Sequence, residues 1–130
     1  MSIRARYLAL LPVIAAGLAA CDKAQQPQIQ KATYADDVAP IMQKYCAECH
    51  VAGQRGAMAS GFVMDSYESI MKGTRFGPVI DPGSAISSSL YILVSGKGDL
   101  TISMPHGREP LSAGEIETIR VWIEKGAMEN

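Results

Sequence analysis

Residues 45–51 read YCAECHV and contain two of the three cysteines in the chain. Cys46 and Cys49 stand three positions apart, and His50 follows the second cysteine directly. On a helical turn, positions i, i+3 and i+4 lie on one face, so the two thiols and the imidazole would project toward the same side. Such a group could be part of a zinc site, a redox-active dithiol, or an attachment point for something larger. The rest of the sequence distinguishes these three interpretations.

The third cysteine, Cys21, follows a segment with the layout of an export signal. Two arginines stand near its start, and residues 7–20 are almost wholly apolar. This apolar run is shorter than the roughly 20 residues of a membrane-spanning helix. It ends in LAAC at 18–21, which resembles the lipobox of bacterial lipoproteins, where cleavage precedes a cysteine that receives a diacylglycerol. We predict a signal peptide at 1–20 and lipidation of Cys21; a short anchor helix and an ordinary secretory signal are the alternatives.

All three alternatives place the folded part outside the cytoplasm. We therefore predict a location in the cell envelope, on the periplasmic side, with a lipid anchor in the membrane. Asp22 resembles the signal that keeps some lipoproteins in the inner membrane, which slightly favours that membrane. Residues 21–32, with the polar sequence DKAQQPQIQKA after the cysteine, are predicted to be a flexible tether with a reach of about 18 Å.

Charge excludes one class of function. The predicted mature chain, residues 21–130, has 10 basic and 13 acidic residues and a formal charge of −3. A generic nucleic-acid-binding domain would be expected to carry a basic patch, so nucleic acid is not a predicted partner. If Cys21 carries lipid, the two remaining cysteines could form a disulfide only within their own small loop, and it would connect nothing distant. The pair is therefore predicted to serve chemistry.

Residues 33–130 are predicted to form one all-α domain. Thr33 caps a first helix in which Val38, Ile41, Met42 and Tyr45 form an apolar stripe that leads into CAECH. Further helices are predicted at 66–72 and 87–94, and a last one opens with the Ser112–Glu115 capping box and ends at Gly126.

The predicted helices are separated by long loops, at 51–61, 74–84 and 97–110. Long loops without structure are unusual inside a compact domain. They are understandable if they wrap around a group that is not protein.

C-x-x-C-H is the attachment signature of c-type haem. Cys46 and Cys49 can form thioethers with the two haem vinyl groups, which holds His50 against the iron as proximal ligand. A structural zinc site usually needs four Cys or His ligands, and only His106 could supply a further one. A thioredoxin-like dithiol opens a helix after a strand, whereas this pair closes a helix. We predict one covalently bound haem c.

Met104 is the predicted distal ligand. It lies in an irregular loop, directly before Pro105 and 54 residues beyond His50, where a loop can pass the far face of the ring. Met42 and Met71 have the spacing of core residues, and Met58 follows His50 closely. His106, another methionine, or an open iron site remain as alternatives.

The chain resembles small class I c-type cytochromes, and among them the Planctomycete-type cytochrome c domain. The similarity extends from about Tyr34 to Ala127. It is carried by CAECH, GFVMDSYESIMKG (61–73), GPVIDPGSAISSSLY (77–91), MP (104–105) and LSAGEIETIRVWIEKGA (111–127). His106 departs from the family, in which a second proline is more frequent.

This resemblance implies a helical domain whose first and last helices cross beside a haem ligated by His50 and Met104. Filling both axial positions leaves electron transfer as the expected function, so we predict an electron carrier and not an enzyme, with redox partner proteins of unknown identity. The alternative is a haem-based sensor or ligand-binding domain in which the distal methionine is displaced.

Overall fold

The structure is a computed structural model that describes residues 31–130, so the predicted signal peptide and Cys21 lie outside the described residues. Within this range the chain forms helices and no strand, which confirms the predicted all-α class. The elements are η1 (Tyr34–Val38), α1 (Ala39–Tyr45), α2 (Ala47–His50), α3 (Arg55–Ser60), α4 (Tyr67–Lys72), η2 (Ala85–Ser87), α5 (Ser89–Val94), η3 (Leu100–Ile102) and α6 (Ala113–Glu124).

The predicted first helix is divided into three pieces. Thr33 caps its start, as expected, by accepting a hydrogen bond from the Asp36 amide, and the first turn, η1, is π-helical. Pro40 stands in the first turn of α1, where the missing N–H costs little. Helix α1 ends before Cys46, and α2 starts at the next residue, so the CAECH turn is a separate short helix.

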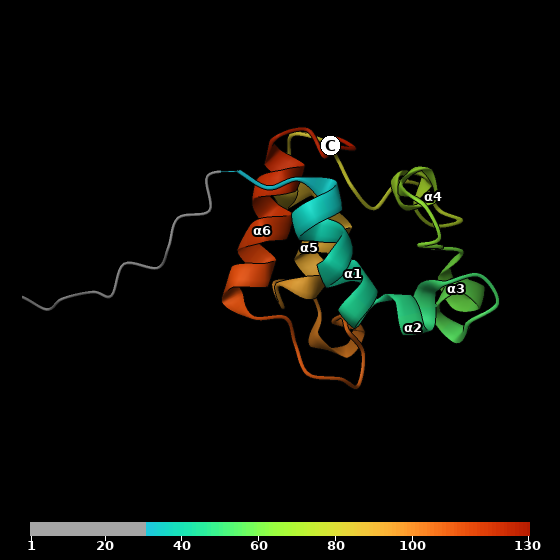
Figure 1. Ribbon diagram of the computed structural model, residues 1–130. Helices are drawn as coiled ribbons and strands as arrows, with labels where there is room; N and C mark the ends of the chain where they lie inside the picture. The colour runs from blue at the N-terminus through green and yellow to red at the C-terminus, as the bar shows by residue number, and fades with distance from the viewer. Residues whose placement is uncertain (1–30) are drawn as a thin grey trace, which may run out of the picture.

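The core lies where η1, α5 and α6 meet. Helix α6 packs against both η1 and α5, and Figure 1 shows α1, α5 and α6 grouped together, with α2, α3 and α4 to one side. Val38, Ile119, Trp122 and Ile123 are almost completely buried there. The Trp122 indole N–H donates to the Met128 carbonyl at 2.9 Å, so even the polar atom of this large side chain is satisfied.

The two ends of the described chain are tied together. The Tyr34 amide donates to the Asn130 side-chain oxygen, and the Ala35 amide donates to the Asn130 carbonyl, both at 3.0 Å. The Tyr67 hydroxyl, from α4, donates to the Ala127 carbonyl at 2.7 Å. These contacts fix η1 and α4 to the residues that follow α6.

Glu115 fixes the other end of α1 to α6. It forms the predicted capping box with Ser112 and also accepts from the Tyr45 hydroxyl at 2.9 Å and from Lys44 at 3.1 Å. Partial burial of the Glu115 carboxyl raises its pKa, but the bonds from Ser112, Lys44 and Tyr45 outweigh burial and lower the pKa to about 2. The carboxylate is therefore ionised at neutral pH, and it holds Tyr45 in position.

The middle of the chain differs from the expectation in two places. Residues 55–60, predicted as loop, form α3, which ends at Gly61 in the left-handed conformation (φ 79°). The glycines at 53 and 56 suggested a loop, but Ala57 and Ala59 favour helix and Ala57 is buried. The predicted helix 87–94 is a helical turn (η2) followed by α5, and buried Ser88 between them bonds Asp81 and Ser84.

Candidate functional site

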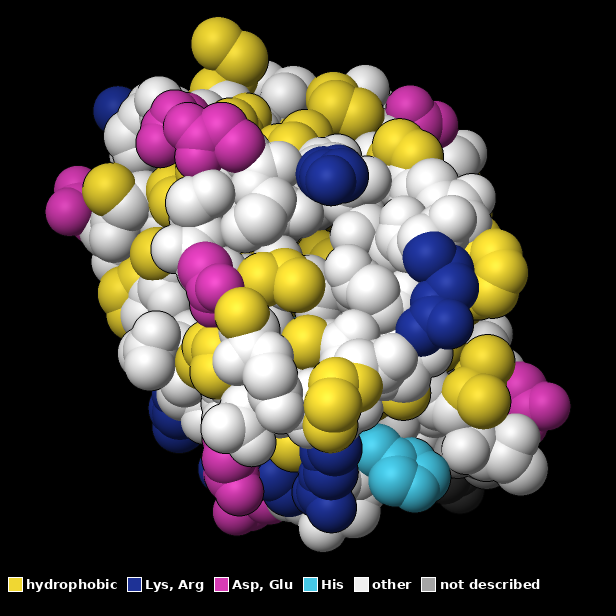
Figure 2. All heavy atoms as spheres, turned by 90° about the vertical axis from the view of Figure 1, so that its right-hand side faces the viewer, with side chains coloured by type: hydrophobic (Ala, Val, Ile, Leu, Met, Phe, Trp, Pro, Cys, Tyr) yellow, Lys and Arg dark blue, Asp and Glu magenta, His cyan; other side chains and the backbone are white. Residues whose placement is uncertain are grey.

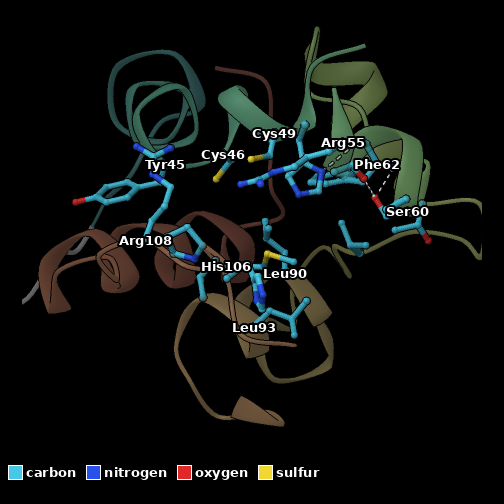
Figure 3. Close-up of a pocket in the computed structure, with 18 residues that line it drawn as sticks. Tyr45, Cys46, Cys49, Arg55, Ser60, Phe62, Leu90, Leu93, His106 and Arg108 are labelled. Carbon is cyan, nitrogen blue, oxygen red and sulfur yellow. Dashed lines mark hydrogen bonds between the residues drawn. The ribbon is translucent and has the colours of Figure 1, made fainter. Parts of the chain in front are cut away.

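A cavity of about 450 Å³ lies between α2 and α3 on one side and α5 with residues 104–108 on the other. Figure 3 shows Cys46 and Cys49 on one wall and Leu90, Leu93 and His106 on the opposite wall. This volume is within the range of small-molecule and cofactor sites. The cavity therefore brings together residues that are up to 63 positions apart in the chain, Tyr45 and Arg108.

Both predicted attachment cysteines line the cavity as free thiols. Burial raises the pKa of the Cys46 thiol from 9.0 to about 11, and the positive charge of Arg108 opposes part of this rise. Cys46 is therefore a neutral thiol at pH 7. The Arg55 side chain, from α3, stands beside Cys49, and the interaction with this side chain raises the pKa of the arginine.

His50 lines the cavity, and its ring is held by Phe62. The His50 Nδ1 lies 3.2 Å from the Phe62 carbonyl oxygen, and the two rings meet edge to face with centroids 5.4 Å apart. A carbonyl can only accept, so this bond places the proton on Nδ1 and leaves the Nε2 lone pair for a metal. Phe62 was missed in the sequence because a backbone carbonyl twelve residues away leaves no pattern.

Gly56 is the second residue that sequence reasoning missed. A Cβ at this position would stand 2.7 Å from the Cys49 carbonyl oxygen and 3.0 Å from His50 Cε1 and Nε2. Real Cβ atoms essentially never approach this closely, so only glycine lets α3 pack on the CAECH turn. A glycine among small residues looked like loop composition, although it marks a close approach.

We expect Gly56→Ala to destabilise the fold by about 1–3 kcal/mol, because the methyl group must push α3 away from the Cys49–His50 turn. Gly114→Ala is the matched control, since a Cβ at that position of α6 meets nothing within 4 Å and alanine favours helix. Denaturant unfolding of both variants gives the comparison. Equal stabilities for the two variants would contradict the close packing at Gly56.

Met104 and His106, the two distal ligands considered from the sequence, both line the wall opposite α2. The Met104 amide donates to the Leu93 carbonyl of α5 at 3.1 Å, and the peptide bond between Met104 and Pro105 is cis. Met42 is buried in the core, whereas Met58 and Met128 are exposed. Of the methionines in the described range, Met104 is the one that borders the cavity.

The chemistry of the lining fits a haem. Its walls are mostly apolar, none of the lining residues is acidic, and exposed Arg55 and Arg108 stand among them. An apolar macrocycle with two carboxylate substituents matches apolar walls and basic side chains. Two thiols, an imidazole with Nδ1 engaged, and a thioether are suitable attachment and ligand groups. Across residues 31–130, no cluster of three or more His, Cys, Asp or Glu side chains is arranged to hold a metal ion.

One comparison with known proteins gives a match, and it covers the segment that lines most of this cavity. Residues 46–106 match the family described as Planctomycete cytochrome C. The match confirms the family that the sequence resembles, and it indicates a haem-binding cytochrome. The matched segment runs from Cys46 to His106 and includes all the lining residues of the cavity except Tyr45 and Arg108. It is shorter than the range from Tyr34 to Ala127 over which similarity was expected.

Searches among curated proteins and among solved structures gave no match. In the part of the chain that the structure describes, no helix has the length and apolar character needed to cross a membrane.

Proposed function

We propose that the chain is a mono-haem c-type cytochrome that carries electrons. One arrangement supports this proposal: the cavity has Cys46, Cys49 and His50 on one wall and Met104 on the other. In the proposed state, Cys46 and Cys49 would attach the haem through thioethers, and His50 and Met104 would supply the ligands to its iron. The haem supplies a one-electron Fe(III)/Fe(II) couple.

The residues of the chain would shape this couple in two ways. The Phe62 carbonyl holds His50 Nδ1–H, which orients the imidazole and makes Nε2 a better donor. Met104 offers a soft thioether, and His/Met ligation raises the reduction potential. With both axial positions filled, no site remains for an external ligand, so the function is electron transfer and not binding of a small molecule.

Absorption spectroscopy of the haem-loaded protein tests the proposal. We expect a c-type spectrum, a methionine-to-iron charge-transfer band in the oxidised form, and little binding of CO by the reduced form. A charge-transfer band that is missing, together with ready CO binding, would favour the haem-based sensor. A colourless protein from cells that have the haem-attachment machinery would overturn both assignments.

We also propose that the carrier is a lipoprotein, anchored through Cys21 on the periplasmic side of the cell envelope. The export-signal layout of residues 1–20 and the LAAC motif support this location. We expect full-length protein in the membrane fraction, extractable with detergent, and the Cys21→Ser variant to lose the lipid. Equal lipid labelling of both proteins would contradict the assignment. Comparing inner and outer membranes tests the preference suggested by Asp22.

A protein partner is proposed on the face formed by α3 and the turn that follows α4. Met58 and Phe76 are exposed there, with 66% and 89% of their surfaces accessible. Arg75 stands over the Phe76 ring and donates to the carbonyls of Met58 and Ala59. Figure 2, which views the molecule from this side, shows hydrophobic side chains with both basic and acidic ones among them. Such a surface fits transient contact with a redox partner, whose identity cross-linking and co-purification would give.

A further inference from the structure

The segment that carries Met104 is long and mostly irregular. Between the end of α5 at Val94 and the start of α6 at Ala113, its regular structure is the short turn η3. The Met104 amide bonds Leu93 of α5, and Leu111 is buried in the core. His106 to Pro110 are exposed. The Met104 side chain packs against the core, and its amide bond to Leu93 fixes the backbone at the cavity.

One contact joins this segment to the opposite wall. Arg108 Nη1 lies 2.7 Å from Glu48 Oε2, although the two residues are 60 positions apart. Glu48 stands between the two attachment cysteines, and Arg108 follows Met104 by four residues. The positive charge of Arg108 also opposes part of the rise that burial causes in the pKa of Cys46, as expected from a guanidinium held near α2. The hydrogen bond from the Met104 amide to the Leu93 carbonyl thus holds the segment to α5 on one wall. The ion pair of Arg108 with Glu48 holds it to α2 on the other wall.

We propose that the Arg108–Glu48 ion pair is a positioning contact that keeps the Met104 segment closed over the cavity. The inference rests on the proposed function, because it concerns Met104 as distal ligand. Arg55 does not perform this task, since its interaction with Cys49 stays on one wall. The Lys44–Glu115 pair joins α1 to α6 and does not contact the Met104 segment.

The expected effect is small but measurable. The side chains of Arg108 and Glu48 are 37% and 69% exposed, so water and salt screen their attraction. Apparent affinity for an external ligand scales with the fraction of molecules whose site is open. Breaking an exposed ion pair should therefore raise the affinity of the reduced protein for CO about two- to five-fold.

The experiment measures CO affinity of haem-loaded protein for wild type, Glu48→Gln, Arg108→Gln and the double variant. We expect each single variant to bind CO about two- to five-fold more tightly, and the double variant to bind no more tightly than either. Arg108→Lys, which keeps the charge, should restore part of the wild-type behaviour. Adding salt should raise the CO affinity of wild type more than that of the double variant.

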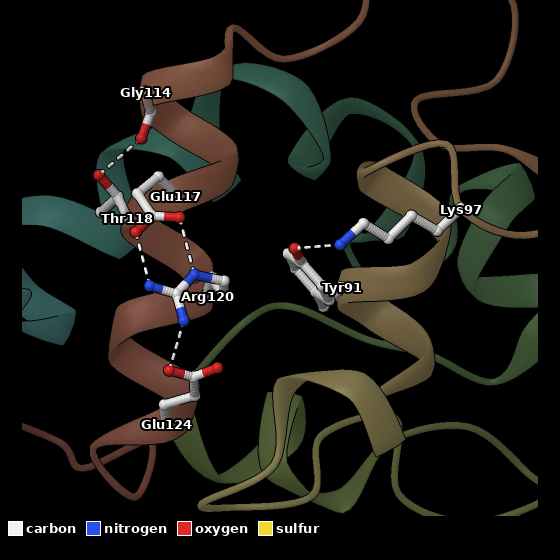
Figure 4. Close-up of polar contacts among 7 residues, drawn as sticks. All are labelled: Tyr91, Lys97, Gly114, Glu117, Thr118, Arg120 and Glu124. Atoms are coloured by element: carbon white, nitrogen blue, oxygen red, sulfur yellow. Dashed lines mark hydrogen bonds and ion pairs between the residues drawn. The ribbon is translucent and has the colours of Figure 1, made fainter. Parts of the chain in front are cut away.

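A matched control lies on α6, where Arg120 pairs with Glu124 on the molecular surface (Figure 4). Glu124→Gln removes a similar ion pair from a helix that carries no lining residue, so the CO affinity should stay at the wild-type value. The positioning role would be overturned if the CO affinity of the Glu48 and Arg108 variants were unchanged, or if Glu124→Gln raised the CO affinity as much as they do. Either result would leave the proposed function standing. Wild-type protein without haem, or without the methionine band, would overturn the proposed function and this inference together.

Discussion

Replacing Cys46 and Cys49 together by alanine is expected to abolish covalent haem retention on a denaturing gel. Both thiols line the cavity, and no other cysteine lies within residues 31–130. Without either sulfur no thioether can form, so denaturation would release any haem that His50 and Met104 still hold. Haem staining after electrophoresis measures this directly, and the expected loss is essentially complete.

The single variants refine this experiment. Cys46→Ala and Cys49→Ala each leave one possible thioether, so weakened staining is expected from both. Met58→Ala is the control, because Met58 is exposed on α3 and does not border the cavity. Normal staining from the double cysteine variant would refute the attachment assignment and reopen the other interpretations of CAECH.

Replacing Met104 by alanine is expected to leave the haem attached while lowering its reduction potential by on the order of 0.1 V. The thioether is a soft ligand that favours Fe(II), and axial ligands tune haem potentials over a wide range. The methyl group of alanine cannot reach the iron, so an open position should appear. Potentiometric titration measures the potential, and CO binding by the reduced variant measures the opening.

The His106→Ala variant tests whether Met104 or His106 is the distal ligand. His106 borders the cavity two positions after Met104. If Met104 is the ligand, His106→Ala keeps the methionine charge-transfer band and changes the potential little. A potential that is unchanged in Met104→Ala and shifted in His106→Ala would move the distal assignment to the histidine.

Features encoded by neighbouring residues could be predicted from the sequence. The Ser112–Glu115 capping box and the Ser66 cap work over one helical turn, so the starts of α6 and α4 agree with the expectation. The C-x-x-C-H spacing is equally local. For Met104, the irregular loop and the following proline were sufficient to predict that this residue lies on the wall opposite His50.

Contacts between distant segments leave no comparable local pattern in the sequence. The Phe62 carbonyl that orients His50 belongs to the backbone and could come from any residue type. Gly56 is required by the approach of α3 to the CAECH turn, which depends on how two helices pack. The Arg108–Glu48 pair joins residues that only the closed cavity brings together. In this protein, pattern identified the groups that would hold a haem, and packing identified the groups that position them.

The tie between Tyr34 and Asn130 has a consequence for how the domain would be oriented. Tyr34 begins η1, and Tyr45, at the far end of the same helical segment, borders the cavity. At 1.5 Å per residue, these two ends are roughly 17 Å apart. With a lipid on Cys21, the flexible tether would join the domain at the Tyr34 end, which is the end opposite the haem pocket. Electrons would then be exchanged on the aqueous side, with partners that diffuse past or project from elsewhere in the envelope.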